Sequence, residues 1–115
     1  MQIQVNTDDN VAGRDALTRR IETEVGNVVG RFAEQITRLE IHLGDHNAGK
    51  SGAQDKRCLI EARLAGRKPE AVSHEADTLE AAWTGAARKL RRSLESTLGR
   101  LGDHKGAASI RKDGI

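Results

Sequence analysis

The sequence predicts an α+β fold in which two helices pack on one face of a four-stranded sheet, in the order strand, helix, three strands, helix (β-α-β-β-β-α). Two kinds of periodicity predict it. Apolar and polar residues alternate in short segments, which is typical of strands with one buried face, and apolar residues recur every three or four positions in two longer segments, which is typical of amphipathic helices. A chain of 115 residues is long enough for one such domain. We assign it to residues 1–102 and expect residues 103–115, which are small and polar, to form a flexible tail.

The first part of the chain predicts one strand and one helix. Residues 2–6 alternate, with Ile3 and Val5 on one side. From about residue 14 a single apolar stripe follows helical spacing: Leu17, Ile21, Val25, Val28 and Phe32. Gly26 and Gly30 interrupt this helix, and each is less favourable there than alanine by about 1 kcal/mol. We therefore expect the helix to depend on its packing and to fray after residue 29.

The middle of the chain predicts three further strands. Leu39, Ile41 and Leu43 alternate with polar residues, and so do residues 57–64. The polar segment 45–55 between them should form the long tip of an antiparallel hairpin. A weaker strand follows at residues 68–75, where Pro69 indicates an edge or a strand start. The outer face of this sheet should be exposed to water, with Gln2, Gln4, Glu40, His42, Glu61 and Arg63 on it.

The last helix has the clearest pattern. Asp77 followed three residues later by Glu80 resembles a capping box. A helical stripe then runs to Gly102, a residue type that commonly ends helices. The stripe consists of Leu79, Trp83, Ala86, Ala87, Leu90, Leu94, Leu98 and Leu101.

Four cations occupy the exposed half of this helix: Arg88, Lys89, Arg91 and Arg92. If Leu90 points into the core, a rotation of about 100° per residue directs positions 88 and 92 outward and places positions 89 and 91 beside them. Residues 82–92 contain no acidic residue, whereas a face that is merely solvated mixes both signs of charge. We interpret the four as a nucleic-acid-binding face. A solvated face remains the alternative that the charge pattern leaves open.

Composition narrows the possible partners. The net charge is +2 and the only aromatic residues are Phe32 and Trp83. Proteins that read single-stranded RNA stack its bases on exposed aromatic side chains, so we expect structured RNA to be bound through its phosphates and its shape. No apolar stretch approaches the roughly 20 residues of a membrane span. A single cysteine fits a reducing cytoplasm, and we predict a cytoplasmic protein that binds no membrane.

No group of residues predicts catalysis. Residues 44–51 match the phosphate-loop pattern G-x-x-x-x-G-K-[ST], but they lead into a strand rather than a helix, so we expect a hairpin tip and keep a nucleotide-binding enzyme as the alternative. Cys58 falls on the inward side of its strand and should be a core residue. The histidines lack the spacing of metal ligands: His42, His46, His74 and His104. We predict no enzyme, no cofactor, no metal and no small-molecule substrate.

Three short segments together resemble a known family. They are Asp15-Ala16-Leu17, Ala81-Ala82-Trp83 and Lys89-Leu90-Arg91-Arg92-Ser93-Leu94. In these segments, in the order of its elements and over residues 1–101, the chain is similar to the ribosome hibernation promoting factor and ribosome-associated inhibitor A family. This family is also called the sigma-54 modulation or ribosomal subunit interface proteins, and the resemblance is to its short form.

The resemblance implies a translation inhibitor that binds ribosomal RNA of the small ribosomal subunit near the decoding region in stress or stationary phase. It implies that Lys89 and Arg92 contact this RNA, and helical geometry adds Arg88 and Arg91. The short form leads us to expect a monomer. The alternative is a protein-interaction module of the same fold that does not bind ribosomes.

Overall fold

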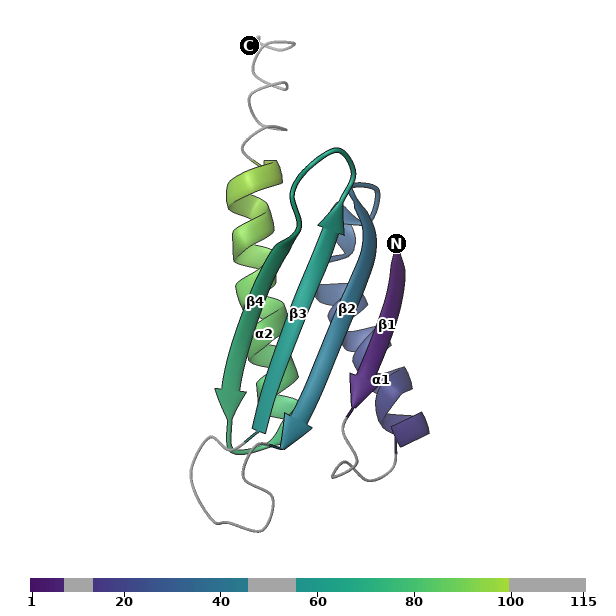
Figure 1. The fold of residues 1–115 in the computed structure, drawn as a ribbon, viewed down its shortest axis with the longest axis vertical. Coiled ribbons are helices and arrows are strands. Elements are labelled where there is room, and N and C mark those ends of the chain that lie inside the picture. Colours follow the sequence, from purple (N-terminus) through teal and green to yellow (C-terminus); the bar gives the residue numbers. More distant parts are fainter. Residues whose placement is uncertain (8–13, 46–55, 100–115) are drawn as a thin grey trace, which may run out of the picture.

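The computed structural model describes residues 1–7, 14–45 and 56–99, and these form the predicted β-α-β-β-β-α order (Figure 1). The elements are β1 (Gln2–Thr7), α1 (Arg14–Val28), a 3-10 turn (Gly30–Phe32), β2 (Ile36–Asp45), β3 (Lys56–Leu64), β4 (Glu70–Ala76), α2 (Leu79–Leu94) and a π-helical turn (Glu95–Gly99). The predicted hairpin tip beyond residue 45 and the predicted tail, residues 103–115, lie outside the described residues.

The four strands form one mixed sheet in the order β1-β2-β3-β4. β1 pairs with β2 in parallel, and the two other pairs are antiparallel. A parallel pair needs a long crossover connection, which α1 supplies. Both helices cover the same face of the sheet, α1 behind β1 and β2 and α2 behind β3 and β4 (Figure 1). The fold class predicted from the sequence is therefore confirmed.

The core lies between this face and the two helices. Alternation along the strands directs Leu39, Ile41 and Ile60 inward, and all three are fully buried. Trp83 is the largest buried side chain, with 1% of its surface exposed. Cys58 is also fully buried on the inner face of β3, as expected for a core residue.

The first helix ends close to residue 29, where fraying was predicted, but the predicted apolar stripe was wrong at Val28. α1 ends at Val28, and the following 3-10 turn carries Phe32 into the core by a different path. The buried residue at the helix end is Val29, whereas Val28 is only partly buried. The chain tightens here because Phe32 and Ala33 bond to carbonyls three residues back, as is common where helices end.

The predicted start of the last helix was also wrong. The N-cap is Thr78, whose side-chain oxygen accepts a hydrogen bond from the backbone N–H of Ala81 at 3.1 Å, and Asp77 stands one residue outside the helix. β4 begins at Glu70, directly after Pro69, which confirms that the proline marks a strand start. The helix was predicted to reach Gly102. α2 ends at Leu94 and passes into the π-helical turn, which reaches Gly99, and residues 100–102 lie outside the described residues.

Candidate nucleic-acid interface

The buried row of α2 determines which of its side chains face solvent. That row comprises Ala82, Trp83, Ala86, Ala87, Leu90 and Leu94. Its helical spacing leaves positions 88, 89, 91 and 92 on the opposite side, and all four cations there are exposed. The structure thus brings the four predicted residues together on one helix surface.

Two of these cations have no ion-pair partner among the described residues, and a third is held at the sheet edge. Lys89 Nζ donates a hydrogen bond to the backbone oxygen of Ser73 at 2.9 Å, which places its ammonium group over β4. Arg88 and Arg92 make no ion pair with any residue that the structure describes. They lie one helical turn apart, about 6 Å along the axis. We call Arg88, Lys89 and Arg92 the α2 basic face.

The fourth cation differs from these three. Arg91 Nε lies 3.2 Å from Glu95 Oε2, one turn further along the helix. The same carboxylate oxygen lies 3.6 Å from Arg31 Nη1, in the 3-10 turn after α1. Arg91 therefore lies on the α1 side of α2, and its charge is offset by a carboxylate.

Two more acidic side chains, Glu24 and Glu80, lie at the junction between the two helices. Trp83 Nε1 donates a hydrogen bond to Glu24 Oε1 at 2.8 Å. The Arg20 guanidinium stacks 5.3 Å from the centre of the Trp83 ring and pairs with Glu24 at 3.3 Å and Glu80 at 3.1 Å. The hydrogen bond to Glu80 is the main cause that raises the pKa of Arg20. The helix layer is therefore close to neutral here. The α2 cations that have no carboxylate partner among the described residues lie on the solvent side of the helix and, at Lys89, next to β4.

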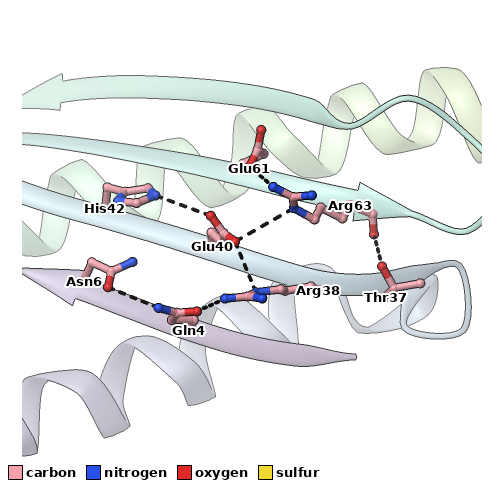
Figure 2. Close-up of polar contacts among 8 residues, drawn as sticks. All are labelled: Gln4, Asn6, Thr37, Arg38, Glu40, His42, Glu61 and Arg63. Atoms are coloured by element: carbon pink, nitrogen blue, oxygen red, sulfur yellow. Dashed lines mark hydrogen bonds and ion pairs between the residues drawn. The ribbon is translucent and has the colours of Figure 1, made fainter.

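The outer face of the sheet is charged but balanced, and Figure 2 shows its contacts. Glu40 is at their centre, with its carboxylate 3.2 Å from Arg38 Nε, 3.8 Å from Arg63 Nε and 3.8 Å from His42 Nε2. Arg63 reaches a second carboxylate, that of Glu61, at 3.7 Å. The outer face is thus polar, as predicted, and its cations Arg38 and Arg63 are already engaged by carboxylates.

The histidines do not form a metal site in the described part of the chain. His42 pairs with Glu40 on the outer face, whereas His74 packs against α2 on the inner face. His46 and His104 lie outside the described residues. Among residues 1–7, 14–45 and 56–99, no three histidine, cysteine, aspartate or glutamate side chains gather closely enough to hold a metal ion.

The phosphate-loop match also gains no support as a nucleotide site. Gly44 is the penultimate residue of β2, residues 46–51 lie outside the described residues, and the chain resumes in strand β3 at Lys56. Cys58 is fully buried, and burial raises the pKa of its thiol to about 12, which disfavours the nucleophilic thiolate. None of the described helices is both long and apolar enough to span a membrane.

Two exposed cations escaped the sequence analysis. Arg67 and Lys68 occupy the turn between β3 and β4, and neither makes an ion pair with a described residue. The signal available in the sequence was a pair of cations between Gly66 and Pro69, two residues that favour a tight turn. Their position next to the end of α2 could come only from the fold.

The chain matches one protein-family model and resembles solved structures. The family model described as sigma 54 modulation protein / S30EA ribosomal protein matches residues 3–101. The N-terminal domain of Protein Y from Thermus thermophilus has a similar structure, with a TM-score of 0.66 and 21% identity, over 84% of this chain and 99% of that one. A ribosomal subunit interface protein from Coxiella burnetii gives 0.63 and 15%, over 84% and 97%. A comparison with curated protein sequences gave no match.

At these identities, the two structural likenesses show that the fold is shared. The match to the family model also supports a conclusion about family membership. Its family consists of ribosome-associated modulation factors, a class that is not enzymatic, and this confirms the prediction that the chain is not an enzyme. Because the model matches residues 3–101 of 115, the protein belongs to the sigma 54 modulation protein / S30EA ribosomal protein family.

Proposed function

We propose that this protein binds the RNA of the small ribosomal subunit through the α2 basic face and thereby holds translation off reversibly. Membership of a ribosome-associated family supports the choice of partner. The observation that carries the RNA contact is the distribution of unpaired charge. Arg88 and Arg92 have no carboxylate partner among the described residues, whereas Glu40 engages Arg38 and Arg63 on the outer sheet face. This distribution favours contact of a polyanion with the helix layer.

The burial of the aromatic side chains indicates which kind of RNA the protein binds. Phe32 and Trp83, the only aromatic residues of the chain, are 4% and 1% exposed. Neither can serve as a platform on which unpaired bases stack, so recognition depends on phosphates, 2′-hydroxyls and shape. Such contacts suit the folded RNA of a ribosomal groove. A protein seated in the groove that tRNA and mRNA use would stop translation by occupancy, and one copy of the chain would be enough.

The test compares two variants that remove the same charge from opposite faces. R88Q/R92Q removes two positive charges from the α2 basic face, and R38Q/R63Q removes two from the outer sheet face. Each is incubated with purified 30S subunits at 50 mM salt and sedimented, and its folding is checked by thermal unfolding. R88Q/R92Q should remain in the supernatant, while R38Q/R63Q should sediment with the subunits as the wild type does.

Three results would contradict the proposal. One is sedimentation of R88Q/R92Q equal to that of the wild type. Another is sedimentation of the wild type that survives high salt and ribonuclease, which would favour a protein partner and the interaction-module alternative. The third is absence of the protein from the 30S, 70S and 100S fractions of a stationary-phase lysate, since the proposed inhibitor acts in the cytoplasm under that condition.

A further inference from the structure

We infer that the turn between β3 and β4 is a second phosphate-binding element, which takes the backbone of the same RNA beyond the end of α2. This inference rests on the proposed function and extends its surface by two residues, Arg67 and Lys68. Both are exposed, and neither pairs with a carboxylate in the part of the chain that the structure describes.

The turn holds these two cations on a short and well-defined backbone. Gly66 has φ +69°, in the left-handed region that glycine adopts without strain. Pro69 fixes its own φ where the chain enters β4. The backbone N–H of Arg67 donates to the carbonyl of Leu64 at 3.4 Å, and that of Ala65 donates to Gln35 at 2.9 Å. A turn restrained in this way loses little conformational entropy when it binds, which favours affinity.

One side of α2 follows β4 from the α2 basic face to this turn. Lys89 contacts Ser73, and one helical turn later Ser93 Oγ donates to Glu70 Oε1 at 2.6 Å. The next residue at this spacing, Thr97, lines a hollow of about 510 Å³ together with the turn residues from Gly66 to Glu70. From position 89 to the end of α2 at Leu94 the helix rises about 7.5 Å, and the π-helical turn carries the chain on to Thr97.

The turn cations therefore continue the α2 basic face past the end of the helix. A duplex strand carries a phosphate every few ångströms along its axis, so a surface that runs from Lys89 to the turn meets more than one of them. Glu70 also lines the hollow, but its carboxylate already accepts the hydrogen bond from Ser93. The two cations outnumber this single acid, and the hollow between turn and helix suits an anionic backbone.

The experiment measures affinity for purified 30S subunits between 50 and 200 mM salt. It compares the wild type with R67Q/K68Q, R88Q/R92Q and R38Q/R63Q, each of which removes two positive charges. Each phosphate contact on a duplex contributes about 0.9 to the slope of log affinity against log salt. We expect R67Q/K68Q to bind more weakly at 50 mM salt, with a slope smaller in magnitude by about two. Over this fourfold range of salt its affinity should then fall about tenfold less than that of the wild type.

The outcomes separate this inference from the proposed function. If R67Q/K68Q and R38Q/R63Q both behave as the wild type while R88Q/R92Q loses binding, the turn is outside the interface and the inference fails, but the proposed function stands. If none of the three variants changes affinity or slope, both fail. Equal thermal unfolding of the four proteins ensures that a loss of affinity reports a lost contact.

Discussion

The imidazole ring of His74 lies where a side chain at position 85 would have to be. A Cβ atom added to Gly85 would stand 2.1 Å from Cδ2 and 2.4 Å from Nε2 of that ring. Glycine inside a helix is less favourable than alanine by about 1 kcal/mol, yet here its bare backbone lets α2 approach β4. This close approach also sets the contact one turn later, where Lys89 reaches the carbonyl of Ser73.

Gly85→Ala should therefore destabilise the protein, although alanine is the better helix former. The new methyl group would clash even with Cγ of His74, the ring atom bonded to Cβ, which is only 2.6 Å away. The whole imidazole ring would therefore have to move. Overpacking of this kind costs about 1–3 kcal/mol, which exceeds the gain in helix propensity. Urea denaturation of the variant gives the change in the free energy of unfolding.

Two further variants show whether the cause is this contact. In a His74→Ala background the same Gly85→Ala change should become stabilising, because the obstructing ring is absent. Gly26→Ala in α1 is the matched control. Among the described residues its Cβ would meet only Ile3 Cδ1, at an ordinary 3.5 Å, so this variant should be more stable than the wild type by up to about 1 kcal/mol. A destabilised Gly26→Ala, or a stabilised Gly85→Ala with His74 in place, would contradict this account.

Thr78→Ala should destabilise the protein, whereas Asp77→Ala should change its stability little. The Thr78 hydroxyl accepts the backbone N–H of Ala81, and loss of an N-cap side chain costs about 0.5–2 kcal/mol. Asp77 is exposed and lies one residue before the cap. Thermal unfolding followed by circular dichroism compares the two variants. A larger loss in Asp77→Ala would mean that the aspartate caps the helix in solution.

The contrast between these two residues illustrates what the sequence can and cannot predict. The alternation through Ile60 and the helical stripe through Leu90 predicted burial correctly, because period and burial are linked directly. Aspartate and threonine are both good N-caps, so the choice between them depends on where the chain leaves β4 and turns into α2. The parallel pairing of β1 with β2 is likewise a tertiary outcome.

The candidate interface was predictable to a similar extent. The exposure of Arg88 and Arg92 followed from helical geometry alone. The pairing of Arg91 with Glu95 was also accessible, because residues four apart on a helix are neighbours. The position of Arg67 beside the end of α2 was not, since it depends on the packing of α2 along β4 as far as the turn between β3 and β4.

The stability of the protein should fall at alkaline pH in a way that depends on Cys58. Burial raises the pKa of this thiol from 9.0 to about 12 in the folded state. The unfolded chain therefore loses the thiol proton first as pH rises, and the native state is disfavoured from about pH 9 upward. The loss amounts to at most about 1.4 kcal/mol per pH unit for one group. Below pH 9 both states keep the proton, and the contribution is fully present.

Cys58→Ala is the variant that isolates this group. Its free energy of unfolding, measured by urea denaturation at pH 8, 9, 10 and 11, should fall less steeply than that of the wild type. Other groups that titrate at high pH are common to both proteins and cancel in the comparison. Parallel curves would show that the Cys58 thiol ionises as easily in the folded protein as in the unfolded chain.

The last prediction concerns the two neighbouring arginines of α2. Arg92 has no carboxylate partner among the described residues, whereas Arg91 is already paired with Glu95 at 3.2 Å. An arginine that must leave a carboxylate to reach a phosphate gains less from binding RNA. Arg92→Gln should therefore weaken binding to 30S subunits more than Arg91→Gln does. It should also reduce the salt slope by about 0.9, the value for one phosphate contact on a duplex.

The carboxylate partner supplies a second, independent readout. Glu95→Gln removes the competing charge and should strengthen binding of the otherwise unchanged protein, because Arg91 and Arg31 then lose their anion. Competition binding with labelled wild-type protein on 30S subunits measures all three variants on one scale. If Arg91→Gln and Arg92→Gln weaken binding equally while Glu95→Gln has no effect, the ion pair does not govern which arginine meets the RNA.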